Sequence, residues 1–238
     1  MTTVAGAYSA VFGRIGALLR AWLAPLLYLA VLVVVSDLAP DNWILTGLFW
    51  LLALPPATLF AVATHRVILL GPDSLTNPWS IYWTQRESDF LWWLFVLGIG
   101  AALLVVALEV TALMSPQTIL GTRVPWLPGL FVFMTATYFV GRLGLVFPAT
   151  ALGRRQILSN SWTLTIGNGA RLLVALAVPW GIYKLLLELI LAGFAPKLPV
   201  VVAIIGGVIA LLTVAVEIAV LSLAYRELQT ADYVPDAG

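Results

Sequence analysis

The sequence contains no cysteine and only one histidine, His65. Without cysteine the chain forms no disulfide, thiolate nucleophile or sulfur-ligated metal site. A single histidine also excludes metal sites built from several imidazole ligands. No nucleophile–base arrangement, phosphate-binding loop or metal-ligand cluster is visible among the other residues. We therefore expect a non-enzymatic protein that carries no cofactor and no metal.

Charged residues are also scarce. They make up 10% of the 238 residues, whereas hydrophobic residues make up 62%. Charged residues account for about a quarter of a typical soluble domain. The composition therefore predicts an integral membrane protein, with membrane lipids as its first partners. The arginines are spread along the chain and form no basic patch, so we expect no nucleic-acid partner.

Six segments are long and apolar enough to cross a membrane, for which a helix needs about 20 apolar residues. They are residues 21–37, 43–63, 90–114, 126–152, 170–194 and 199–224. All six are too long and too uniformly apolar for the alternating strands of a membrane barrel. The predicted fold class is all-α, a polytopic membrane protein. Its six transmembrane helices form three hairpins in a domain of residues 21–228, and residues 229–238 are a cytoplasmic tail.

The positive charges between these spans predict their direction. One side carries only Arg123 and Lys197. The other side carries Arg14, Arg20, Arg66, Arg86, Arg154, Arg155, Arg171 and Arg226. Cytoplasmic loops are enriched in Lys and Arg, so the arginine-rich side is predicted to be cytoplasmic. Both termini then lie in the cytoplasm.

The first twenty residues have the pattern of an amphipathic helix. Apolar residues from Val4 to Trp22 recur at helical spacing, while Ser9, Arg14 and Arg20 occupy much of the other face. We interpret residues 1–20 as an interfacial helix before the first span. It either senses the membrane or docks a partner, or it leads into the first span and packs beneath the bundle.

Two other cytoplasmic segments, 71–89 and 153–171, hold most of the polar residues. The first contains Trp79, Tyr82 and Trp83, which are typical of the headgroup level of a membrane. The second, GRRQILSNSWTLTIGNGAR, combines basic and hydroxyl side chains that suit an anionic lipid headgroup. The candidate headgroup site comprises Arg154, Arg155, Ser159, Ser161, Thr163 and Thr165. The alternative is a short surface helix that ends at the glycines.

The stretch RLGLVFPAT, residues 142–150, places a charge inside the fourth span. At about 1.5 Å per residue, Arg142 lies about 24 Å from the outer end of its span, and Glu217 about 27 Å from the outer end of the sixth. A charge at this depth is tolerated when it is paired inside the bundle. We therefore predict an ion pair between Arg142 and Glu217, in a span that continues to about Leu152 and is kinked by Pro148.

A second group of charges lies near the outer ends of the spans. Lys184 and Glu188 are four residues apart, so they share one helix face and are expected to pair. Glu109, near the outer end of the third span, is a candidate third member. The group is either a proton or cation relay, or a local pair whose side chains reach the outer surface.

Several short motifs recur together in this chain. They are Arg142-Leu143, Leu145, Pro148-Ala149, Ser161-Trp162, Thr165, Gly167-Asn168 and Arg171-Leu172, with HRVILLG at 65–71 and AYREL at 224–228. This pattern resembles a group of poorly characterised bacterial inner-membrane proteins, which are similar to the membrane domain of some glycerophosphoryl diester phosphodiesterases. The resemblance implies a six-span protein of the bacterial inner membrane. The catalytic domain of those phosphodiesterases is a separate barrel, for which this chain has no room, so the hydrolase activity is not expected here.

Two functions remain after these exclusions. The first is a non-enzymatic membrane protein that binds lipids or other membrane proteins as an accessory or organising subunit. The alternative is a small transporter or lipid-handling protein with a cavity around Arg142 and Glu217. A polar cavity that reaches Arg142 would favour the second hypothesis, whereas a dry arginine beside an apolar binding surface would favour the first.

Overall fold

A computed structural model of the chain describes residues 4–38, 42–75, 82–114, 127–154, 158–194 and 199–232. Within these ranges all regular structure is helical. Six of the described helices are long and apolar enough to cross a membrane, with α7 completing the fourth span. The long helices are α2 (Ile15–Leu38), α3 (Trp43–Leu70), α4 (Gln85–Met114), α6 (Leu127–Leu143), α9 (Gly169–Phe194) and α10 (Pro199–Asp232). The predicted all-α polytopic fold is confirmed.

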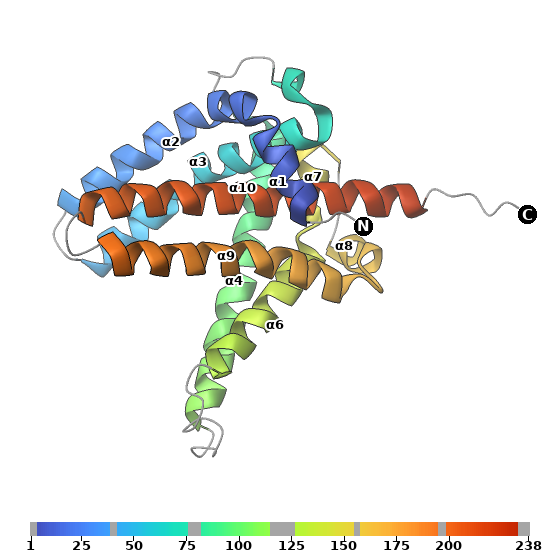
Figure 1. Cartoon of the computed structure of the whole chain (residues 1–238). Helices are drawn as coiled ribbons and strands as arrows, with labels where there is room; N and C mark the ends of the chain where they lie inside the picture. The colour runs from blue at the N-terminus through green and yellow to red at the C-terminus, as the bar shows by residue number, and fades with distance from the viewer. Residues whose placement is uncertain are drawn as a thin grey trace, which may run out of the picture.

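The spans form the hairpins α2–α3, α4–α6 and α9–α10, which meet at one end of the molecule (Figure 1). This end, called the terminal end below, also holds the two ends of the described chain and the short helices. The short helices are α1 (Val4–Phe12), η1 (Pro72–Ser74), α7 (Val146–Ala151) and α8 (Leu158–Leu164). Away from the terminal end, the α4–α6 hairpin diverges clearly from the other two hairpins (Figure 1).

The protein core lies at the terminal end. Trp22, Ile68, Leu145 and Tyr225 are fully or almost fully buried there. Toward the other end of the spans large apolar side chains are exposed, as at Trp50, whose exposed fraction is 74%. Apolar side chains gain little by leaving lipid for protein, so helix contacts in a membrane depend on shape and polar bonds. The polar bonds of this chain are correspondingly important at the terminal end.

The N-terminal helix is shorter than the sequence suggested. α1 ends at Phe12, and α2 already begins at Ile15, so the predicted helix of residues 1–20 is divided at Gly13 and Arg14. Arg14 Nη1 donates to the carbonyl oxygens of Val67 and Ile68, both at 2.6 Å, and so satisfies carbonyls in the last turn of α3. α1 packs against α10, and its Ala7 and Val11 are buried. This packing agrees with the interpretation of the segment as a lead-in helix beneath the bundle.

The fourth span is broken rather than kinked. α6 ends at Leu143 and α7 begins at Val146, so the break precedes Pro148 by several residues. Pro148 has no N–H to give to the carbonyl of Gly144. That carbonyl accepts from the Phe147 N–H instead, at 3.1 Å. The predicted continuation of the span to about Leu152 is confirmed by the described span Leu130–Ala151, but the helix is interrupted at Gly144 and Leu145 and not merely kinked.

Candidate functional site

The most elaborate polar site surrounds Arg142, whose residue is only 8% exposed. Its Nε donates to Thr165 Oγ1 at 3.0 Å, and its Nη2 donates to the carbonyl of Trp162 at 2.8 Å. Its Nη1 donates to the Tyr138 hydroxyl at 3.2 Å. The guanidinium carbon lies 3.6 Å from the centre of the Trp162 ring, a cation–π contact. Neutral groups from α6, α8 and the turn after α8 therefore hold this charge.

Ser161 closes the same site from the other side. Its hydroxyl oxygen lies 2.7 Å from the carbonyl oxygen of Arg142 and 3.0 Å from that of Leu143. These are the last two residues of α6, where helix carbonyls lose their regular partners. A bare carbonyl is costly at membrane depth, so α8 stabilises the end of α6.

Gly169 allows α9 to approach this site closely. A Cβ at this position would lie 2.8 Å from Tyr138 Cε2 and 3.2 Å from Arg142 Cδ. The preceding turn is made possible by Gly167, whose φ of 78° favours glycine. The glycines of the GNG motif thus turn the chain out of α8 and let α9 begin against the Arg142 side chain.

The predicted ion pair between Arg142 and Glu217 does not form. The hydrogen bonds of Arg142 to described residues go to Thr165, Trp162 and Tyr138. Glu217 of α10 instead interacts with Trp180 of α9. Within the described ranges, ion pairs join Arg86 to Glu87 and Lys184 to Glu188. Equal depth did not bring the two groups together, because the Arg142 side chain is directed toward α8 and the turn that follows it.

The candidate headgroup site in residues 153–171 is not one site. Ser161 and Thr165 are buried and bound to the Arg142 region. Arg154 Nη1 instead donates to Gln229 Oε1 of α10. The remaining described members, Ser159 and Thr163, are joined within α8, where the Thr163 hydroxyl donates to the Ser159 carbonyl at 2.9 Å, and Arg155 lies outside the described residues. The segment ties helices together instead of presenting these hydroxyl groups jointly to a ligand.

The predicted group of Lys184, Glu188 and Glu109 is confirmed for its first two members. Lys184 Nζ lies 3.2 Å from Glu188 Oε1, and both side chains are largely exposed. The side chain of Glu109 lies outside the described residues, so the predicted three-membered relay stays a prediction. The described pair has the geometry of a local helix-surface contact.

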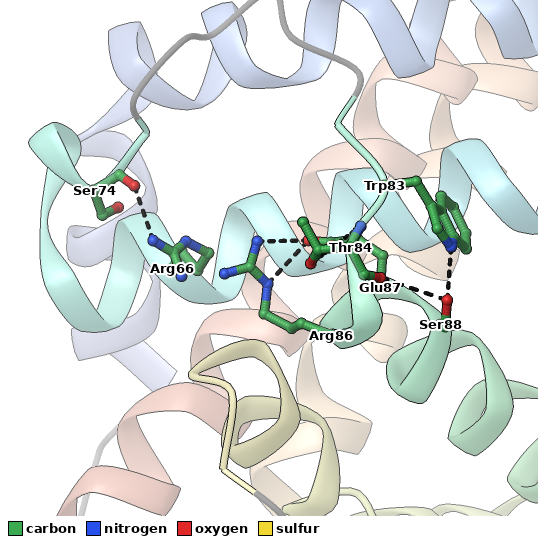
Figure 2. Close-up of polar contacts among 7 residues, drawn as sticks. All are labelled: Arg66, Ser74, Trp83, Thr84, Arg86, Glu87 and Ser88. Atoms are coloured by element: carbon green, nitrogen blue, oxygen red, sulfur yellow. Dashed lines mark hydrogen bonds and ion pairs between the residues drawn. The ribbon is translucent and has the colours of Figure 1, made fainter.

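The sequence interpretation missed a compact charged cluster at the start of α4 (Figure 2). Glu87 Oε1 accepts from Arg86 Nε at 2.9 Å and from Arg86 Nη2 at 2.7 Å. Glu87 Oε2 accepts from both the backbone N–H and the hydroxyl of Thr84. TQRE, residues 84–87, has the spacing of a capping box, so this signal was present in the sequence. Arg66, from the end of α3, lies beside the cluster.

Polar bonds also join α2, α3 and α10 within the core. The indole N–H of Trp22 donates to Thr64 Oγ1 at 2.9 Å. Next along α3, His65 Nδ1 lies 2.7 Å from Ser222 Oγ, and both side chains are buried. The single histidine is therefore a link between α3 and α10.

An apolar groove separates parts of α4 and α6. It has a volume of about 260 Å³. Its lining is Leu97, Gly100, Ala101 and Leu104 of α4 with Ala136, Phe139, Val140 and Leu143 of α6. A Cβ on Gly100 would meet no atom within 4 Å, so the groove is open at this position.

These features define a polytopic α-helical membrane protein in which neutral partners hold Arg142 and local ion pairs join Arg86 to Glu87 and Lys184 to Glu188. Comparisons with protein-family models, curated proteins and solved structures gave no match.

Proposed function

We propose that this protein is a non-enzymatic accessory or organising subunit of a bacterial inner membrane, which acts by binding lipids or other membrane proteins. The apolar groove between α4 and α6 is the observation that carries this proposal. Its described lining contains only apolar side chains and glycine, so its occupant must be an acyl chain or the apolar side chains of another helix.

The arrangement of the spans supports the same function. The α4–α6 hairpin diverges from the other two hairpins (Figure 1), and large apolar side chains on it are exposed, among them Leu103 and Phe131. Gly98 and Gly100 lie on this hairpin with open space where a side chain would be. Small residues in membrane helices favour close approach of another helix, which is a reason to include membrane proteins among the partners.

We place the terminal end in the cytoplasm. Arg14, Arg66, Arg86 and Arg154 all belong to segments at this end. The excess of arginine on cytoplasmic loops favours this direction, with both termini inside the cell.

The transporter hypothesis has weaker support. It required one cavity lined by Arg142 and Glu217, but these residues interact with different partners on different helices. Arg142 has three donor groups engaged by protein and an aromatic ring over its guanidinium, which matches a structural charge.

A photo-crosslinking amino acid in place of Leu104 tests the proposal in cell membranes. Leu104 lines the groove, whereas the neighbouring Leu103 is 65% exposed and does not, so the same probe at 103 is the matched control. We expect mass spectrometry to find a discrete lipid or protein adduct at 104 and mixed bulk lipid at 103. Identical adducts at both positions would count against a binding groove.

A further inference from the structure

We propose that Arg66 and Arg86 form a binding site for a phosphate group, at the terminal ends of α3 and α4. The site extends the proposed lipid-binding function to a polar ligand group, and it is separate from the α4–α6 groove. Leu97, the nearest groove residue of α4, is about 16 Å along the helix axis from Arg86 at 1.5 Å per residue.

The charges of the cluster do not balance. Arg66 and Arg86 are close enough for their positive charges to repel each other, and Glu87 is the carboxylate that acts on Arg66. Both oxygens of Glu87 are already occupied, one by Arg86 and the other by Thr84. Two positively charged guanidinium groups therefore lie near one carboxylate, whose two oxygens already accept hydrogen bonds. The cluster keeps one excess positive charge.

Arg66 has several N–H donors that bond to no described residue. Its Nη2 donates to the carbonyl of Ser74 at 3.0 Å, and this is its one hydrogen bond to a described residue. Figure 2 shows the guanidinium groups of Arg66 and Arg86 beside each other, between the end of α3 and the start of α4. An anion between them would replace repulsion with attraction. The planar fork of donors on each guanidinium suits the oxygens of a phosphate, which accepts two parallel hydrogen bonds.

The site is accessible and lies at the depth where a phosphate is expected. The Arg86 side chain is 27% exposed, although Glu87 beneath it is 3% exposed. The first turn of α4 adds the positive end of a helix dipole. Tyr82 and Trp83 are exposed next to this turn, as aromatic rings are at the headgroup level of a membrane. A phospholipid headgroup and a free phosphate group share the chemistry that this site would bind.

The test uses the full chain, purified in a neutral detergent, and native mass spectrometry of bound phosphatidylglycerol. The variant R66Q removes the arginine with fewer hydrogen bonds to described residues and leaves the Arg86–Glu87 pair in place. The control R20Q removes an exposed arginine whose hydrogen bond to a described residue goes to the Gly16 carbonyl in its own helix. We expect R66Q to weaken binding by about tenfold, the ratio that one charge-assisted hydrogen bond supplies, and R20Q to bind as the wild type does.

A competition measurement identifies the source of the phosphate. Inorganic phosphate at millimolar concentration should not displace phosphatidylglycerol if the ligand is a lipid headgroup, and it should do so if the site takes free phosphate. Equal binding of phosphatidylglycerol by R66Q, R20Q and the wild type would overturn the site. The groove experiment at Leu104 is unaffected by either result, so the two proposals fail separately.

A measurement on the wild type covers the case in which R66Q does not fold. Phenylglyoxal modifies accessible arginines, and peptide mass spectrometry locates the products. Bound phosphatidylglycerol should protect Arg66 and Arg86 from this reagent, while Arg20 stays reactive. Modification of Arg66 and Arg86 at the same rate with and without the lipid would disprove the proposal.

Discussion

The guanidinium carbon of Arg142 lies 3.6 Å from the centre of the Trp162 ring. Trp162 also accepts a hydrogen bond from this arginine through its carbonyl oxygen, so one residue of α8 contacts the charge twice. The contact fixes α8 to the end of α6. It also explains why the arginine needs no carboxylate, since aromatic faces and neutral acceptors hold a cation away from water.

Exchanging the charges of Arg142 and Glu217 should not restore the protein. R142E is expected to reduce thermal stability strongly, because it removes three hydrogen bonds and places a carboxylate against carbonyl and hydroxyl acceptors. The double variant R142E/E217R should be no more stable than R142E, because the two positions do not meet. Melting temperatures in detergent measure this. Recovery of the wild-type melting temperature in the double variant would show that residues 142 and 217 do interact.

Ser161→Ala should lower the free energy of unfolding by about 1–2 kcal/mol, because the last carbonyls of α6 lose their partner. Ser159→Ala is the control, since Ser159 is exposed on the same short helix. The two variants are compared by denaturation in mixed micelles. A loss of stability in S159A as large as that in S161A would remove the capping role of Ser161.

Two glycines of α9 should respond to alanine in opposite directions. Gly169→Ala forces a methyl group against Tyr138 and should destabilise the protein by about 1–3 kcal/mol. Gly181→Ala adds a methyl group where no atom lies within 4 Å, and the better helix propensity of alanine should stabilise by up to about 1 kcal/mol. Thermal denaturation of both variants measures whether each substitution lowers or raises the stability of the protein. An unchanged stability in G169A would show that α9 does not depend on this close approach.

Arg14→Gln should loosen α1 from the bundle. The side chain of Arg14 holds two carbonyls in the last turn of α3, and α1 joins α2 at this residue. Hydrogen–deuterium exchange should become faster in residues 4–12 and at the end of α3, while the exposed control R20Q leaves it unchanged. If the exchange of residues 4–12 is the same in R14Q and the wild type, Arg14 is not what anchors this helix.

The spans were predictable because their signal is local. Length and apolar composition locate each hairpin, and the four-residue spacing of Lys184 and Glu188 was enough to predict their contact. The three-residue spacing of Thr84 and Glu87 is a similar local signal. The distribution of charged residues alone did not reveal it. Contacts within one or two helix turns follow from helical periodicity.

The Arg142 site was only partly predictable for the opposite reason. Its depth in the span followed from counting residues, but depth says nothing about the direction in which a side chain points. Two of the three hydrogen-bond partners of Arg142, Trp162 and Thr165, lie 20 and 23 residues later, on α8 and the turn that follows it. Trp162 carries no charge, so a comparison of the depths of charged residues did not point to it. Ser161 and Thr165 were assigned to a lipid headgroup site, but their hydroxyl groups bond within the protein.

The α4–α6 hairpin diverges from the other two hairpins, so we expect its tilt to respond to the surrounding bilayer. The hairpins are held together mainly at the terminal end, so a small rotation there is amplified along the spans. A tilt of about 10° moves the far end of a 17-residue helix such as α6 by about 4–5 Å, given a rise of 1.5 Å per residue. Helices adjust their tilt to the hydrophobic thickness that surrounds them. We therefore expect the tilt of α6 relative to the other hairpins to differ between thin and thick bilayers.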